Sequence, residues 1–160
     1  MTPHETFDTC MDALASALEL TLPDRAENDP VILSIDGTEV TLREDAAGQW
    51  VVITAEIGEM PPDARGVFSA LALQANYASL GATELSLDAE TGDLFATTSL
   101  PLALADPDAL SRAVEALVNT AEEWSRNATA FLDVDEEVEL SEADDEDASP
   151  FSGNLEFLRV

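Results

Sequence analysis

Apart from its carboxylates, this chain has few side chains suited to acid–base, nucleophilic or metal chemistry. His4 is the single histidine and lies near the N-terminus, where chains usually fray, and Cys10 is the single cysteine. All six basic residues are arginines, so no lysine is available for a Schiff base or for the phosphate grip of a P-loop. The chain therefore lacks the histidines needed for a histidine-based nucleophile relay or for a multi-histidine metal site. We therefore expect no enzyme activity and no cofactor.

Carboxylates are plentiful, and a close pair of them could serve as general acid and base. Glu39, Glu84 and Asp88 occupy outward positions of predicted strands, and Glu115 and Glu122 lie on the polar face of a predicted helix. A catalytic carboxyl needs burial or a nearby like charge to shift its pKa. A solvated surface therefore explains these residues better than a catalytic pair.

Acidity dominates the composition, with a formal net charge of -28. So negative a field repels nucleic acid and anionic membrane surfaces and favours basic or amphipathic partners, although solubility or salt adaptation alone could explain it. The densest acidic run, residues 133–147, should repel itself and remain extended or disordered. Val138 stands where an EF-hand loop needs glycine, so this tail could bind cations weakly but is no EF-hand. We expect no specific metal site.

Hydrophobic spacing predicts an α+β fold with the order α-β-β-β-α-β-β-α, in which an antiparallel sheet packs against helices. The predicted helices cover residues 6–22, 64–80 and 107–131, and the predicted strands cover 31–36, 39–44, 50–57, 83–88 and 94–100. Asp36-Gly37 is a tight-turn signal, and Asp106-Pro107 supplies a cap and a first residue for the last helix. We expect a domain over residues 1–132 and an acidic tail over 133–160 with an apolar end.

The predicted second helix, residues 64–80, is apolar on nearly every side. Its apolar positions are Val67, Phe68, Leu71, Leu73, Tyr77 and Leu80. A surface helix needs only one apolar stripe, so this pattern implies burial on two sides. No window of the sequence approaches the length of a membrane span, and a second copy of the chain is the natural cover. We therefore predict an obligate homodimer.

Strand alternation places a set of apolar side chains on the sheet face away from the helices: Trp50, Val52 and Phe95. They could form a hydrophobic groove for an extended or helical peptide. They could equally be covered by one another, by the dimer interface or by the apolar C-terminal end. The sequence leaves both interpretations open.

Three stretches of the chain carry a family pattern. They are the hairpin around Ser34-Ile35-Asp36-Gly37, the helix segment Leu71-Ala72-Leu73-Gln74-Ala75-Asn76, and the strand Leu85-Ser86-Leu87-Asp88 that leads through Gly92-Asp93-Leu94 to Leu100-Pro101-Leu102. With the element order, size and acidity, they resemble the class I chaperones of bacterial type III secretion, the Tir chaperone (CesT-like) family. The segment 110–124 resembles the last helix of that family, and the acidic tail lies outside the resemblance.

The resemblance implies a homodimer that binds the N-terminal region of a secreted effector and holds it at least partly unfolded until export. It implies no enzyme activity, nucleotide or metal. The effector-binding residues carried over are Leu14, Leu18, Trp50, Val52 and Phe95. The dimer-interface residues carried over are Val67, Phe68, Leu71, Gln74, Ala75, Tyr77 and Leu85.

A cytoplasmic location is expected, because no basic stretch followed by an apolar core stands near the N-terminus and the single cysteine cannot form an internal disulfide. The alternative function is a regulatory adaptor of the same fold without a secretion client, in which the acidic tail modulates partner binding.

Overall fold

The computed structural model describes residues 6–22, 24, 26, 29–79 and 83–141. The helices are α1 (Phe7–Ala17), α2 (Arg65–Ser79), the short 3-10 helix η1 (Leu102–Leu104) and α3 (Pro107–Ser141). The strands are β1 (Val31–Ile35), β2 (Thr38–Glu44), β3 (Trp50–Glu59), β4 (Glu84–Leu87) and β5 (Asp93–Pro101). The predicted order α-β-β-β-α-β-β-α is confirmed. Contacts divide the chain into two compact units, Met1–Arg126 and Asn127–Val160, and the sheet belongs to the first.

The strands form one antiparallel sheet in the order β1-β2-β3-β5-β4, so β1 and β4 are its edge strands. The β1–β2 hairpin turns at Asp36 and Gly37, whose φ angles are 51° and 88°. Positive φ at both central residues is what a type I′ turn requires. Ile35 pairs with Thr38 directly across the turn. The Asp-Gly dipeptide therefore sets the register of this hairpin.

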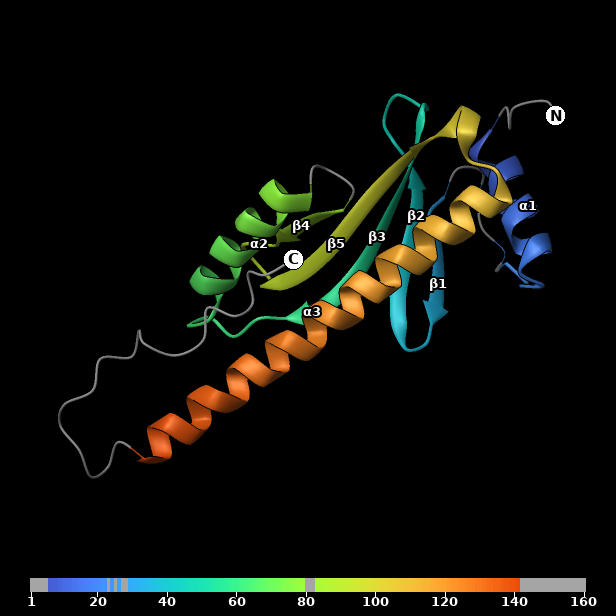
Figure 1. Cartoon of the computed structure of the whole chain (residues 1–160). Coiled ribbons are helices and arrows are strands. Elements are labelled where there is room, and N and C mark those ends of the chain that lie inside the picture. The colour runs from blue at the N-terminus through green and yellow to red at the C-terminus, as the bar shows by residue number, and fades with distance from the viewer. Residues whose placement is uncertain (1–5, 23, 25, 27–28, 80–82, 142–160) are drawn as a thin grey trace. The chain divides into compact units, whose positions relative to one another are not determined.

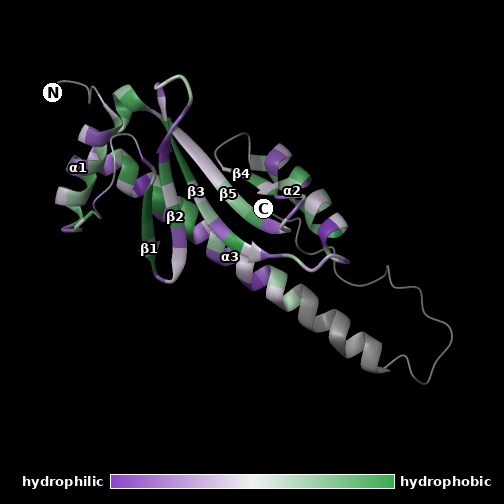
Figure 2. Cartoon of the chain, turned by 180° about the vertical axis from the view of Figure 1, so that it is seen from behind, coloured by the Kyte–Doolittle hydropathy of each residue, from purple (hydrophilic) through white to green (hydrophobic). Residues whose placement is uncertain are grey.

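One face of the sheet carries the hydrophobic core. Its fully buried strand residues include Val40, Leu42, Val51, Ile53 and Leu94. Figure 1 shows α1 and the first part of α3 over this face. On α3, the buried side chains recur at helical spacing: Leu110, Val114, Leu117, Val118 and Ala121. In the view from behind of Figure 2, the strands lie in front of α3, so the other face is turned away from these helices.

Helix α1 ends earlier than the sequence pattern suggested. The expected end near residue 22 is wrong, because the chain leaves the helix at Leu18 through a Schellman motif. Glu19 takes a left-handed conformation with φ 54°, and the Leu20 N–H donates to the Ala15 carbonyl at 2.9 Å. The sequence has neither glycine nor asparagine at this position to indicate the end of the helix.

Helix α3 begins where expected and continues further than expected. The Asp106 carboxylate accepts the Ala109 N–H at 2.7 Å, and Pro107 is the first helical residue. The expectation of an extended or disordered chain from residue 133 is wrong for residues 133–141, whose backbone is helical. Glutamate favours helices, and adding residues to an existing helix costs far less than starting one. Residues 142–160, with the rest of the acidic run and the apolar end, lie outside the described residues.

Candidate functional site

The two edges of the sheet differ in what covers them. At β4, the edge is covered by a side chain of α2: Asn76 Nδ2 donates to the Leu85 carbonyl at 2.9 Å, and the Leu85 N–H donates to Asn76 Oδ1 at 2.7 Å. The Asn76 carboxamide thus makes the two hydrogen bonds that a neighbouring strand would make. A further strand cannot pair with β4 at Leu85 while α2 is in place.

At β1, the edge is open. Because Ile35 and Thr38 flank a two-residue turn, they form a hydrogen-bonded pair, and the ladder then alternates. Ile32 and Ser34 therefore direct their N–H and C=O groups away from β2. Within the described part of the chain, no backbone hydrogen bond reaches this edge. Edge groups of this kind can pair with a strand from another chain.

Beside this edge lies the sheet face that α1 and α3 do not cover. Ile32 projects from it and is 55% exposed. Cross-strand pairing aligns Ile32 in one row with residues of the next three strands, which are Thr41, Thr54 and Thr97. The Thr54 and Thr97 hydroxyls lie 3.4 Å apart. The centre of this face is therefore a threonine ladder, and its apolar side chains lie around that ladder.

The structure brings together only part of the expected effector-binding set. Trp50, 42% exposed, lies two residues from Val52 on one strand face and pairs with Pro101. Phe95 pairs with Glu56, six residues further along β3 and therefore about 20 Å from Trp50. The threonine ladder lies between them. Trp50, Val52 and Phe95 thus share a face but do not form one continuous groove.

The two effector-binding residues expected on α1 have different environments. Leu14 is 2% exposed and belongs to the core, whereas Leu18 is 39% exposed at the helix end. Helical spacing placed both on one apolar stripe, but the early end of α1 leaves Leu18 at the surface. Ile32 was missed because Val31, Ile32 and Leu33 are consecutive apolar residues, so no alternation in the sequence marks Ile32 as outward-facing.

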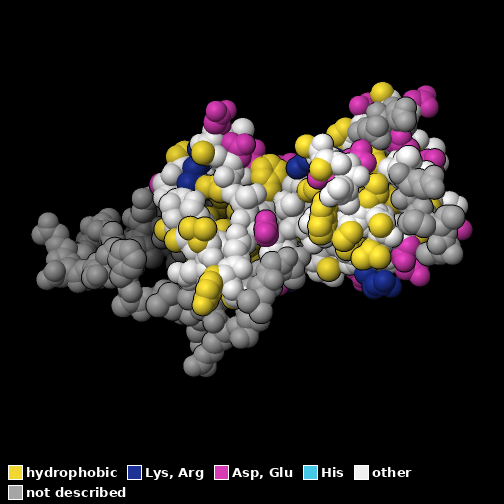
Figure 3. All heavy atoms as spheres, turned by 90° about the horizontal axis from the view of Figure 1, so that it is seen from above, with side chains coloured by type: hydrophobic (Ala, Val, Ile, Leu, Met, Phe, Trp, Pro, Cys, Tyr) yellow, Lys and Arg dark blue, Asp and Glu magenta, His cyan; other side chains and the backbone are white. Residues whose placement is uncertain are grey.

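Helix α2 exposes an apolar stripe. Tyr77 is 88% exposed, Leu73 is 70% exposed and Val67 is 44% exposed. Hydrophobic side chains gather in separate areas of the face seen in Figure 3, where basic side chains are few. Three side chains of this size on one helix call for a cover. We name Val67, Leu73 and Tyr77 the α2 stripe.

The expected dimer-interface residues divide between this stripe and the core. Phe68 and Leu85 are buried within the subunit, while Leu71 and Ala75 are half-buried. Gln74 is exposed beside the stripe. Leu73 was left out of the expected interface, although it belongs to the all-round apolar pattern of the helix.

Helix α2 is held at its start as well as at Asn76. Arg65 Nε donates to the Met60 carbonyl at 3.0 Å, and Arg65 Nη2 donates to the Thr91 carbonyl at 2.7 Å. A Cβ atom on Gly92, whose φ is 86°, would overlap the Arg65 guanidinium. Arg65 and Asn76 therefore fix the orientation of the α2 stripe relative to β4 and β5.

The carboxyls with lowered pKa values stabilise turns. Backbone N–H groups of Trp50, Gln49 and Ala47 donate to Asp45 and lower its pKa. Hydrogen bonds from the backbone of Thr91 and Glu90 do the same for Asp88. Both side chains are occupied in capping hairpin turns.

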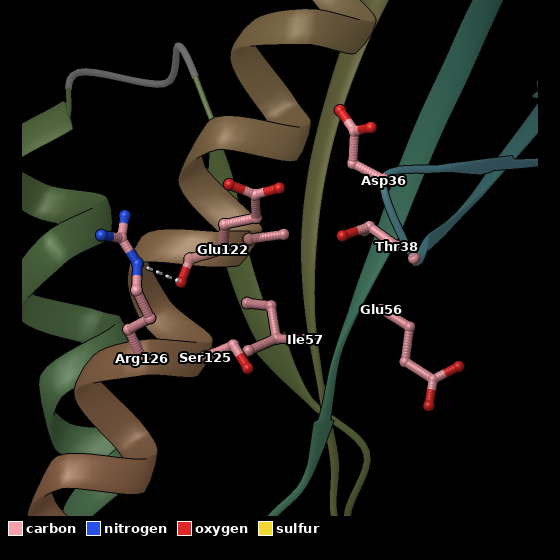
Figure 4. Close-up of a pocket in the computed structure, with 9 residues that line it drawn as sticks. Asp36, Thr38, Glu56, Ile57, Glu122, Ser125 and Arg126 are labelled. Carbon is pink, nitrogen blue, oxygen red and sulfur yellow. Dashed lines mark hydrogen bonds between the residues drawn. The ribbon is translucent and has the colours of Figure 1, made fainter.

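A hollow of about 370 Å³ lies between the β1–β2 turn, β3 and α3. Its lining includes Asp36, Glu56 and Glu122, and Figure 4 shows that these three carboxylates do not converge on a common point. Arg126 Nε donates to the Glu122 carbonyl of its own helix at 3.3 Å. The hollow presents scattered negative charge and no arrangement for catalysis.

The described residues form neither a metal centre nor a membrane-spanning helix. Among them, His, Cys, Asp and Glu form no group of three that could hold a metal ion. None of the described helices combines the length and apolarity needed to cross a membrane. Burial raises the pKa of the Cys10 thiol to about 11, so it stays protonated and unreactive at neutral pH.

Comparison with known proteins supplies the family. Residues 9–125 match the Tir chaperone protein (CesT) family. The chain belongs to this family. The matched region runs from α1 into α3 and includes the whole sheet, the Asn76 contact and the α2 stripe. No curated protein sequence is similar enough to count as a relative.

Solved structures share the fold of this CesT-family chain. A chain of the HopA1–SchA chaperone–effector complex matches with a TM-score of 0.62 and 21% identity, over 75% of this chain and 93% of that chain. A chain of the ExoT–SpcS complex from Pseudomonas aeruginosa matches with a TM-score of 0.55 and 24% identity, over 71% and 92%. YbjN from E. coli matches with a TM-score of 0.63 and 17% identity, over 82% and 97%. At these identities, the likeness establishes the fold alone.

Proposed function

We propose that this CesT-family chain is a chaperone that binds the N-terminal region of a type III secreted effector and keeps it soluble and export-competent. The observation that carries the proposal is the difference between the two sheet edges. Asn76 satisfies the β4 edge at Leu85, whereas Ile32 and Ser34 leave the β1 edge open. An extended client segment can therefore add to the sheet at β1 and not at β4.

The client is bound through its backbone first. The outward N–H and C=O groups of Ile32 and Ser34 pair with the backbone of an extended segment, whatever its side chains. The exposed Ile32 side chain then covers an apolar client residue in the same row. A client that is still unfolded offers both features, because its strand edges and apolar side chains are not yet buried.

Membership of the family supports a secretion client over the adaptor alternative. The HopA1–SchA structure is named as a chaperone–effector complex. YbjN, which is named as a putative transcription regulator, shares the same fold. The fold by itself therefore does not assign a client. Membership of the Tir chaperone protein family therefore carries more weight here than structural likeness.

We further propose that the working form is a homodimer joined through the α2 stripe. Leu73 and Tyr77 are among the most exposed large apolar side chains of the described residues. An identical stripe on a second copy covers both and leaves the β1 edge of each copy open. Arg65 and Asn76 hold the helix in one orientation, which reduces the ordering cost of association.

The chain acts in the cytoplasm, where a client waits before export, and no catalytic step is assigned to it. The carboxyls with lowered pKa values, Asp45 and Asp88, are engaged by turn backbone. The net charge of -28 keeps complexes apart from one another and steers positively charged client segments toward the surface.

Co-purification with N-terminal effector fragments tests the proposal. Ser34→Pro removes one outward N–H and is tolerated at an edge strand, so the variant should fold but retain less fragment. Ser34→Thr keeps the N–H and serves as the control. Equal retention of the fragments by both variants and the wild type would contradict binding at β1, and no retention by the wild type would contradict the chaperone function.

A further inference from the structure

We propose that the client segment bound at β1 carries a basic side chain two positions from an apolar one, on the face of the sheet that bears Ile32. This inference rests on the proposed function and names the chemistry of the segment that the edge accepts. It follows from three features: the row positions of Ile32 and Ser34, the two carboxylates beside them, and the small size of Ser34.

The row positions determine which client side chains share a face. Ile32 and Ser34 lie two residues apart, so their side chains project from the same face. For either strand direction, the client residues beside them also lie two positions apart and share that face. The residue beside Ile32 meets an apolar side chain that is 55% exposed. It is therefore apolar, while the residue beside Ser34 meets a different environment.

That environment is acidic. Glu39 is paired with Ser34 across the β1–β2 ladder. Glu39 and Glu56 each stand one residue beyond the Val40–Ala55 pair of β2 and β3, so their carboxylates lie near one another on this face. Glu56 also borders the hollow beside α3, but Figure 4 shows its side chain on the opposite side of β3 from Ile57. Both are exposed, and within the described residues neither forms an ion pair. Like charges on neighbouring strands repel, and a cation between them removes this repulsion.

Among the residues that the structure describes, the nearest basic side chain on this sheet face is Arg43, and it does not neutralise them. Arg43 lies four residues beyond Glu39 on β2, in the row of Val52, which corresponds to about 13 Å along the strand. The threonine row lies between. Within the described residues, no ion pair neutralises Glu39 or Glu56, so a basic side chain of a partner fits beside them.

The small side chain of Ser34 lets a partner reach them. A client strand would lie about 5 Å from β1 and about 10 Å from β2. A long arginine or lysine side chain beside Ser34 can extend across it to the Glu39 carboxylate, and its apolar stem can lie along the strand. A bulky residue at position 34 would block this path.

One client residue lies between the apolar residue and the basic residue. Its side chain projects from the opposite face of the sheet. It lies beside Leu33, which is half-buried on the core face of the sheet. An apolar side chain suits that position. The segment accepted by β1 is thus an apolar pair followed or preceded by a basic residue, according to strand direction.

Labelled peptides of defined sequence test this inference. The probes are fluorescein-labelled Thr-Val-Val-X-Val-Val-Thr peptides in which X is Arg, Gln or Glu, so that both strand directions present the same pattern, and binding is followed by anisotropy and by the amide NMR signals of Ile32 and Ser34. The Arg peptide should bind about threefold more tightly than the Gln peptide, as expected for an exposed charge pair. The Glu peptide should bind most weakly.

Two charge variants separate a local effect from the overall negative field. Glu39→Gln should remove most of the Arg preference, whereas Glu84→Gln, which removes an exposed carboxylate of the same face at β4, should leave it intact. An Arg preference that falls equally in both variants would overturn the inference, since net charge alone would explain it.

The remaining outcomes are distinguishable. If no peptide shifts the Ile32 and Ser34 signals, the open edge does not take a client and the proposed function itself fails. If Ile32→Asp changes the oligomeric state and leaves peptide binding intact, a second copy occupies the edge and the inference is overturned.

Discussion

Asn76 and Leu85 are joined by two hydrogen bonds that replace a missing strand, with the Leu85 N–H donating to Asn76 Oδ1 at 2.7 Å and Asn76 Nδ2 donating to the Leu85 carbonyl at 2.9 Å. This contact makes α2 part of the sheet edge. It also makes the two sheet edges unequal, because a further strand can pair only with β1. The proposals for the client and for the dimer both depend on α2 staying in this place.

Loss of this contact should destabilise the fold. Asn76→Ala leaves the part-buried peptide groups of Leu85 without their partner and should cost about 1–3 kcal/mol in the free energy of unfolding, measured by urea denaturation. Asn119→Ala is the matched control, since it makes the same change at an exposed position of α3. If both variants lose the same stability, Asn76 does not hold the edge.

The α2 stripe should control the oligomeric state. Leu73→Glu combined with Tyr77→Glu places two charges where the second copy packs, so sedimentation velocity at micromolar concentration should show monomers. Leu104→Glu changes a side chain that is 67% exposed on η1 and should leave the dimer unchanged. A dimer that persists in the double variant would exclude this stripe as the interface.

The Asp45 turn should make part of the stability dependent on pH. The pKa of Asp45 is lowered in the folded chain, so the ionised form contributes stability above the unfolded pKa of about 4, and this is lost as the pH falls through the folded pKa. The melting temperature of Asp45→Ala should therefore fall below that of the wild type at pH 7, with a smaller gap near pH 3. A gap that is constant across this range would contradict the role of the charge.

Local sequence signals were sufficient where a short segment determines its own conformation. Asp36-Gly37 specified a turn whose φ angles both had to be positive, and Asp106-Pro107 specified the start of α3. The strand faces also followed from alternation, since Trp50 and Val52 do lie opposite the buried Val51.

Features that depend on contacts between distant parts of the sequence could not be predicted from local sequence signals. The separation of Trp50 from Phe95 depends on the pairing of β3 with β5, and the burial of Leu14 depends on what packs against α1. The end of α1 depends on Glu19 adopting a left-handed conformation that its residue type does not favour. The role of Asn76 was not anticipated, because a carboxamide paired with a strand edge requires α2 to lie beside β4.

Backbone amide hydrogen exchange on the chain with an N-terminal effector fragment bound tests the central claim most directly. Pairing at β1 predicts that the exchange of the Ile32 and Ser34 amides slows by at least about tenfold, because each amide gains a backbone hydrogen bond. The Leu85 amide, already bonded to Asn76, should keep its rate. A bound fragment that leaves the Ile32 and Ser34 amides exchanging as in the free chain would contradict the account.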